Sequence, residues 1–297
     1  MIATAKLVGA VAAGWVALAA WLGPTSDRPQ DPQAGDGAAI HYFWDAFQHH
    51  QERQSDAIAR LSARAVAADA TPKERLYTGL AHLWALAEGG GDAVQSHAHA
   101  VLAEHWLARA EAADPADTRI AGWRQSARWA IADLEHDEAA RAAAVARLEA
   151  LAQAEPCFHS IPLGIVAFDL PRTHAGFTKA LAALNAAFAC GAESGGQDRP
   201  KWPHNVAGYL VALADFRLKA GDLAGAEAAL VIAEARESTA QWPHRRLLDE
   251  RLGGLRERAA LYADADPTND PPFALRSGTV SCSACHAAAS PAEPTRR

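Results

Sequence analysis

The chain has 297 residues, half of them apolar, and a formal net charge of −7 from 28 basic and 35 acidic side chains. This acidic balance disfavours nucleic acid as a partner, because such proteins present clustered Lys and Arg to phosphates. Many of the apolar residues are alanines, and no run of alternating β-branched residues predicts a strand. The composition therefore predicts an all-α protein with closely spaced helices.

Residues 1–22 have the pattern of an export signal. Lys6 is followed by an uncharged apolar run over residues 7–22. The best cleavage candidate, Ala17-Leu18-Ala19, lies inside that run, so both a cleaved signal peptide and a retained N-terminal membrane anchor stay open. As a helix the run rises only about 24 Å, against a bilayer core of about 30 Å, so an anchor would need neighbouring residues. In either case we expect the rest of the chain in the periplasm.

The remaining chain divides into a linker, a helical domain and a C-terminal segment. Residues 23–38 are rich in Pro, Gly and Asp, which is typical of a solvated linker. Residues 39–263 alternate helical patterns with breakers, which predicts ten or eleven helices. One helix should begin at Pro72, because Thr71 and Glu74 have the spacing of a capping box. Residues 264–297 follow as a separate segment.

A pattern of small and branched apolar residues recurs along the helical domain. The first two copies are 41 residues apart, and the third follows after twice that interval. The three copies are Ala103, Leu107 and Ala110; Ala144, Leu148 and Leu151; and Ala226, Leu230 and Ala233. Weaker copies are Ala57 with Leu61 and, shifted by three residues, Ala182, Ala186 and Ala189.

These positions resemble the second helix of tetratricopeptide repeats, in which small residues let two antiparallel helices approach closely. Four residues resemble the first helix and tight turn of such a repeat: Leu213, Ala214, Gly221 and Asp222. The chain departs from the family in its period of 41 instead of about 34, in Arg217 where an aromatic is common, and in Ser238 where proline is usual. The best single unit covers residues 207–238.

The resemblance implies an α-solenoid of degenerate helical hairpins over residues 39–263, with a concave surface that binds a protein or peptide partner. The alternative is an Ala-rich helical bundle, because Ala and Leu at these spacings mark any helix packing face. A repeat fold does not by itself fix the function.

The C-terminal segment contains the most specific motif of the chain, Cys282-Ser283-Ala284-Cys285-His286. Cys-x-x-Cys-His is the attachment motif of c-type haem, in which the two thiols form thioethers to the porphyrin and the histidine is the proximal iron ligand. The alternatives are chance, or a bare Cys-x-x-Cys redox or zinc pair. Covalent attachment outside the cytoplasm agrees with the export signal. We therefore expect one covalently bound haem c, held by Cys282, Cys285 and His286.

The sixth iron ligand is argued by elimination. The one methionine is Met1, on the wrong side of the export segment, so the sulfur ligand of many cytochromes is excluded. A histidine, another donor or an open position remain. His204 and His244 are the distal candidates, with His244 preferred, because each follows Trp-Pro where a helix is expected to begin. The alternative is that Trp-Pro only starts the helices. Phe273 and Leu275 could cover the haem with apolar surface.

Two further cysteines, Cys157 and Cys190, flank a helical pair. In an oxidising compartment they could close a disulfide, the alternative being two buried free thiols.

Three functions agree with these features. We expect an exported mono-haem c-type cytochrome that transfers electrons while its helical repeats dock it onto a protein redox partner. An envelope scaffold without a redox role is the first alternative. A haem-based sensor or peroxidase-like protein is the second, and it would need an open iron position and a distal acid-base residue. No nucleophile elbow, phosphate loop or zinc-protease motif is present, which favours an electron carrier or binding subunit over an enzyme.

Overall fold

The computed structural model describes residues 37–88, 92–168, 170–193, 205–236, 239–240, 242, 244–264 and 269–274. Within these ranges the chain forms twelve α-helices, one short 3₁₀ helix and no strand, so the all-α prediction is confirmed there. The elements are α3 (Ala38–His49), η2 (Gln51–Arg53), α4 (Gln54–Ala65), α5 (Pro72–Glu88), α6 (Ala93–Ala113), α7 (Thr118–Leu134), α8 (Glu138–Ala154), α9 (Pro156–Ala167), α10 (Ala175–Glu193), α11 (Asn205–Lys219), α12 (Leu223–Glu234), α13 (Arg245–Gly253) and α14 (Leu255–Ala263).

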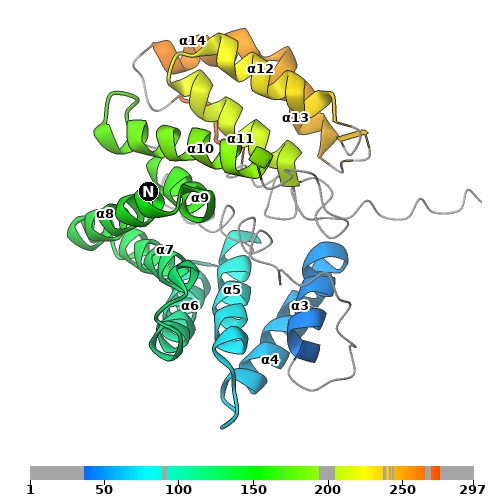
Figure 1. Cartoon of the computed structure of the whole chain (residues 1–297), viewed down its shortest axis with the longest axis vertical. Helices are drawn as coiled ribbons and strands as arrows, with labels where there is room; N and C mark the ends of the chain where they lie inside the picture. Colours follow the sequence, from blue (N-terminus) through cyan, green and yellow to red (C-terminus); the bar gives the residue numbers. More distant parts are fainter. Residues whose placement is uncertain are drawn as a thin grey trace, which may run out of the picture.

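The helices follow one another in chain order around an open curve (Figure 1). Each helix from α3 to α12 packs against the next one along the chain. In addition, α3, α5, α7 and α9 touch in succession, and α8 touches α10. At the other end of the curve, α14 packs against α11 and α12. Most contacts are therefore made between helices that are near neighbours in the sequence.

Side-chain caps fix where several helices begin. Glu74 accepts a hydrogen bond from the backbone N–H of Thr71 (2.8 Å), and the Thr71 hydroxyl accepts one from the N–H of Glu74 (3.1 Å), which confirms the capping box. Asp92, Asp137 and Asp222 cap α6, α8 and α12 in the same way, each accepting an N–H from three residues on. Each of these bonds spans only three residues. The start of these helices could therefore be predicted from the local sequence.

The recurring small residues lie where helices touch. All nine residues of the three clear copies are buried. At Gly79 of α5, an added Cβ would lie 2.6 Å from Leu107 Cγ and 3.2 Å from the Ala103 carbonyl oxygen of α6. The weak copy in α10 is wrong, because Ala182 and Ala186 are exposed, while the Ala189 side chain lies outside the described residues. The buried face of α10 instead consists of Phe177, Ala180, Ala183, Leu184 and Ala187.

Two tight turns between paired helices have the same geometry but different residues. Gly221, between α11 and α12, has φ = 90°, and His136, between α7 and α8, has φ = 58°. Both lie just before a capping aspartate. A positive φ is unstrained for glycine and costs energy for histidine, so Gly221 suits its turn better than His136 does.

Arg217 explains one departure from the tetratricopeptide pattern. Its guanidinium donates to the carbonyl oxygen of Gly225 in α12 (3.0 Å) and to Asn185 Oδ1 in α10 (2.7 Å). One arginine thus joins three helices through hydrogen bonds where an aromatic side chain would only pack.

None of the described helices is long and apolar enough to cross a membrane. The export segment at residues 1–22 and all of the expected linker except residues 37–38 lie outside the described residues.

Candidate functional site

The predicted haem ligands lie outside the described residues. This applies to Cys282, Cys285 and His286, and to the distal candidate His204. His244, the other distal candidate, is described: it is the residue before α13, half-buried, with its ring 6.2 Å from that of the buried Trp242. Burial lowers the pKa of the His244 imidazole. A helix start with a buried tryptophan agrees with the alternative interpretation of Trp-Pro-His.

The chain just before the haem motif is held firmly against the helices. We call residues 270–274 the anchored segment. Asp215 of α11 accepts a hydrogen bond from the backbone N–H of Ala274 (2.7 Å). Tyr262 of α14 donates its hydroxyl to the carbonyl oxygen of Pro271 (2.9 Å). The carbonyl oxygen of Pro272 accepts from Arg251 (3.2 Å) and Arg258 (3.3 Å). Backbone groups of an irregular segment are thus satisfied by buried side chains.

Asp215 is the centre of this anchor. Its side chain is 2% exposed, and it accepts bonds from Arg251 Nε and Arg258 Nη2, each at 3.0 Å. One carboxylate therefore faces two guanidinium groups and one backbone N–H. Burial, with the Asp215 charge as the second cause, raises the pKa of the neighbouring Tyr262 hydroxyl, which keeps it protonated and able to donate. Removing the carboxylate would leave two partly or fully buried cations without their shared partner.

Lys219, one turn further along α11, holds the start of the anchored segment. Its ammonium donates to the carbonyl oxygen of Phe168 (2.8 Å) and pairs with Asp270 (3.0 Å), and its side chain is only 7% exposed. It also lies 5.0 Å from the ring centre of Phe168 and 5.9 Å from those of Phe177 and Tyr262. A cation almost without water is thus compensated by a carbonyl, a carboxylate and aromatic faces.

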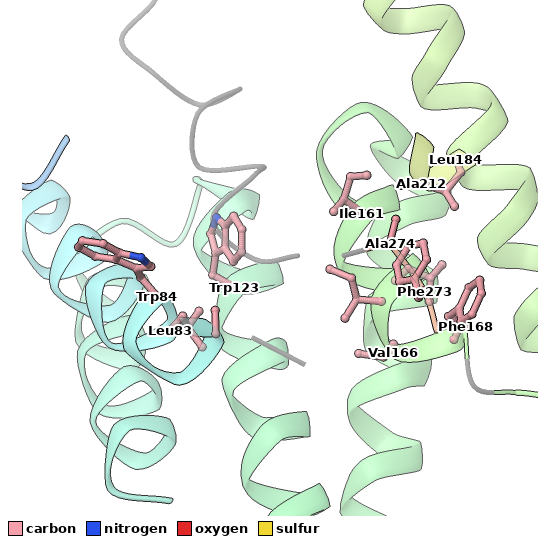
Figure 2. Packing of buried hydrophobic residues seen from close by; sticks show 14 of the residues in the cluster. Leu83, Trp84, Trp123, Ile161, Val166, Phe168, Leu184, Ala212, Phe273 and Ala274 are labelled. Atoms are coloured by element: carbon pink, nitrogen blue, oxygen red, sulfur yellow. The ribbon is translucent and has the colours of Figure 1, made fainter. Parts of the chain in front are cut away.

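Phe273 packs within the helical core. Its ring stacks on Phe168 at 4.4 Å between centroids and meets the edge of Phe216 at 5.5 Å. Figure 2 shows Phe273 and Ala274 among Ile161, Val166 and Phe168 of the region around α9. Phe273 is 2% exposed, so its apolar surface is used to dock the anchored segment; Leu275 lies outside the described residues.

The anchor limits how far the predicted haem ligands can lie from the helical array. Eight peptide steps separate Ala274 from Cys282, and a fully extended chain advances about 3.5 Å per residue. A thioether cysteine at position 282 would therefore lie within about 28 Å of Ala274.

Among the described histidines, His159 of α9 is the one with a buried nitrogen that lacks a partner. Its side chain is 1% exposed, and Nε2 has no hydrogen-bond partner. Its ring lies against Gly122 of α7, where an added Cβ would be 2.4 Å from Nδ1. Burial lowers the pKa of this imidazole. An unsatisfied buried polar atom costs about 1–3 kcal/mol, so its presence calls for a ligand, a water or a functional reason.

A second buried imidazole, His82 of α5, does have a partner. Its Nδ1 lies 3.0 Å from Nδ1 of His99 in α6, so the two rings share one hydrogen bond. Burial, with His99 as the second cause, lowers the pKa of His82 to about 4, and burial also lowers the pKa of His99. Within the described residues, no group of three or more His, Cys, Asp or Glu side chains could hold a metal ion. The pair joins α5 to α6.

The structure records Cys157 as disulfide-bonded. The side chains of the other three cysteines lie outside the described residues, so pairing with Cys190 stays a prediction. A disulfide at Cys157 agrees with the oxidising compartment that the export segment predicts.

A cleft of about 610 Å³ opens between α6, α7 and α8. Its charged lining residues have both signs: Glu104, Arg128, Glu135 and Arg147. Alanine side chains of α8 complete the lining. The cleft therefore combines small apolar surface with charges of both signs.

Comparisons with models of known protein families, with curated proteins and with solved structures find no match. Sequence reasoning missed both the anchored segment and His159. The prolines at 271 and 272 excluded a helix there correctly, but nothing local indicated that Asp215, 59 residues earlier, would bind the backbone of Ala274.

Proposed function

We propose that this chain is an exported mono-haem c-type cytochrome that transfers electrons to or from a protein partner. The haem is attached by Cys282 and Cys285, and His286 is its proximal iron ligand. The helical array holds the haem-bearing tail and provides the docking surface. When bound, the haem supplies a one-electron ferrous–ferric couple.

The observation that carries this proposal is the anchored segment, which begins twelve residues before Cys282. Two buried ionic groups, Asp215 and Lys219, are used to fix a short irregular segment that has no helix or strand of its own. Buried charges are costly unless they are fully paired. The array uses these buried groups to fix the chain shortly before Cys282. This supports a role in positioning the group that Cys282 and Cys285 would carry.

The described residues around the anchor are close-packed, with Phe273 2% exposed and His159 1% exposed, so a haem on Cys282 and Cys285 would lie against the outside of the array. Aromatic side chains hold the anchored segment from within the core. Arg251 and Arg258 bind Asp215 and the carbonyl oxygen of Pro272, so the chain that leads to the motif starts from a fixed point.

The finer description of the array is part of the proposal. The chain-order packing of the helices and the burial of the recurring Ala and Leu positions support an α-solenoid of degenerate tetratricopeptide-like hairpins. In such a fold each hairpin covers the apolar face of its neighbour, and the terminal segment covers the last one. The anchored segment, with Phe273 in the core, has that covering role beside α11 and α14.

The proposal is tested by reversible reduction of the protein matured in a periplasm that attaches c-type haem. We expect one haem per chain, a single reversible one-electron wave, and ferrous protein that does not bind carbon monoxide readily. The Cys282→Ser, Cys285→Ser double variant should carry no covalent haem and show no wave. Ready carbon monoxide binding with turnover of peroxide would instead identify the sensor or peroxidase alternative.

The cleft between α6, α7 and α8 supports a second candidate, a protein-binding scaffold of the envelope without a redox role. Its mixed charges suit a peptide rather than a single ion. The scaffold would be favoured if the matured protein is colourless and still binds a partner. The Arg128→Ala variant should then lose that binding.

A further inference from the structure

The helices around the cleft form an inner row and an outer row. In the inner row α5, α7 and α9 touch in succession, while α6 and α8 lie on the outer side of the curve (Figure 1). In the outer row α8 packs against α10, but in the described part of the chain no comparable packing joins α6 to α8. The cleft of about 610 Å³ lies at this interruption, over α7. The outer row therefore has an open position between two of its helices.

The floor of the cleft is apolar and made of small residues. It consists of Ile131 and Ala132 of α7 and of Ala140, Ala143 and Ala144 of α8. Ile131 is half-buried, and Ala140 and Ala143 are exposed. Small side chains let a packed helix approach closely, because the distance between two helix axes is set by the side chains at their contact. This floor is thus suited to the apolar face of another helix.

The charges on the rim of the cleft have a direction. Arg141 of α8 binds Asp133 of α7 (2.8 Å), and this contact sets the register of the two antiparallel helices. In that register Arg147 lies at the level of Arg128, and Glu135 lies at the other end of the cleft. From Arg128 to Glu135, α7 rises about 10 Å. The cleft is positive at one end and negative at the other, with the apolar floor between them.

Two of the four charged groups are available to a partner. Glu104 and Arg128 bind each other at 3.2 Å. Glu135 is 52% exposed and contacts the ring of His97 (2.8 Å), which leaves its second oxygen open to solvent-side donors. Arg147 is exposed and makes no ion pair within the described residues. A ligand of this cleft therefore gains most from an anionic group at Arg147 and a cationic group at Glu135.

From these observations we infer that the cleft between α6, α7 and α8 is a docking site for an amphipathic α-helix of a partner protein. The inference rests on the partner-binding role proposed above for this cleft, and it does not require the haem. The bound helix fills the open position of the outer row, with its apolar face on the alanine floor. It places an acidic side chain at Arg147 and, about seven residues or two turns away, a basic side chain at Glu135. This site is separate from the concave surface that the repeat resemblance implies.

The test uses the full chain, matured in a periplasm that attaches c-type haem, and synthetic helical peptides with the same length and the same apolar face. One peptide carries Glu and Lys seven positions apart, and two others carry Glu at both positions or Lys at both. Fluorescence anisotropy of the labelled peptides gives the dissociation constants. We expect the wild type to bind the Glu–Lys peptide at least about fivefold more tightly than either of the others, because each of those brings one like charge to the rim.

Variants of the rim and the floor separate docking in the cleft from non-specific binding. Arg147→Glu changes an exposed group, so the variant should fold, and we expect it to prefer the Lys–Lys peptide by about fivefold. Ala143→Gln places a larger polar side chain on the floor and should weaken binding of the Glu–Lys peptide by about tenfold. Arg172→Glu is the matched control, because Arg172 is exposed and lies outside the cleft lining. It should bind the peptides as the wild type does.

The inference is overturned if no peptide binds, if the wild type has no preference among the three peptides, or if Arg147→Glu keeps the wild-type preference. It is also overturned, in favour of a second copy of this chain, if the wild type is a dimer that Arg147→Glu dissociates. Covalent haem is measured on the same samples. Loss of the peptide preference with haem attached overturns this inference alone, whereas specific peptide binding by a chain without haem supports it and overturns the proposed cytochrome function.

Discussion

Single small residues set how closely the helices of this chain approach each other. Gly79 is the clearest case, because an added Cβ would come within 2.6 Å of Leu107 and 3.2 Å of a backbone oxygen. We expect Gly79→Ala to lower the free energy of unfolding by about 1–3 kcal/mol, since α5 and α6 must move apart. The measurement is urea denaturation. Gly253→Ala is the control, because its Cβ would meet nothing within 4 Å, and it should be neutral or slightly stabilising.

The His82–His99 pair should make stability depend on pH. The folded pKa of His82 is about 4, below the value of about 6.5 in an unfolded chain. Between these two values the unfolded state binds more protons, so stability is fully present above about pH 6.5 and is lost as the pH falls toward 4. The loss from His82 is on the order of 3 kcal/mol.

His82→Gln removes the titrating group and keeps a polar side chain. We expect urea denaturation at pH 7 and pH 4.5 to show a smaller pH effect in this variant than in the wild type, by about 2 kcal/mol. His105→Gln, at an exposed position of α6, should retain the wild-type pH effect. Equal pH effects in His82→Gln and the wild type would mean that the pair does not stay neutral in the folded state.

At the scale of helices, local signals predicted where helices begin, but the spacing of small residues did not predict which face of α10 is buried. The Thr71–Glu74 box and the capping aspartates act over three residues, so their spacing predicts helix starts directly. In α10 small residues occur on several faces, and the choice of Ala182 and Ala186 as the buried face was wrong because period alone does not set the phase. Cys-x-x-Cys-His is likewise local, which is why the haem prediction could be made from sequence.

Long-range contacts could not be predicted in this way. Asp215 and Lys219 read as ordinary charges on α11, and only the folded chain brings them to residues 270–274. His159 has no spacing signature at all, since one histidine in an apolar helix is usually a satisfied core residue. The surroundings of its ring depend on Gly122, 37 residues earlier, and its Nε2 has no partner within the described structure.

The anchor yields a prediction for the elements that it joins. Asp215→Asn leaves Arg251 and Arg258 without their shared carboxylate, so we expect a loss of about 3–5 kcal/mol in the free energy of unfolding. Amide hydrogen exchange at Ala274 should become faster, because its acceptor is weakened. In contrast, Asp249→Asn breaks an exposed pair with Arg245 and should cost less than about 1 kcal/mol. Similar losses in both variants would contradict the central role of Asp215.

At the scale of the whole molecule, two parts that are separate in the sequence share one core. The helices of residues 38–263 form one continuous hydrophobic core, and Phe273 and Ala274 of the anchored segment belong to that same core. The anchored segment is therefore fixed to the array as far as Ala274, eight residues before Cys282. A fixed point of this kind suits a cofactor that must meet a partner at a defined surface.

The most direct measurement of the central claim is the mass of the mature, periplasmically expressed chain under denaturing conditions, together with its absorption after reduction in alkaline pyridine. We predict a mass that exceeds the polypeptide by one haem, located by peptide mapping on Cys282 and Cys285, and the spectrum of haem bound through two thioethers. A chain with only its polypeptide mass and no haem spectrum, obtained from cells that mature other c-type cytochromes, would contradict the account.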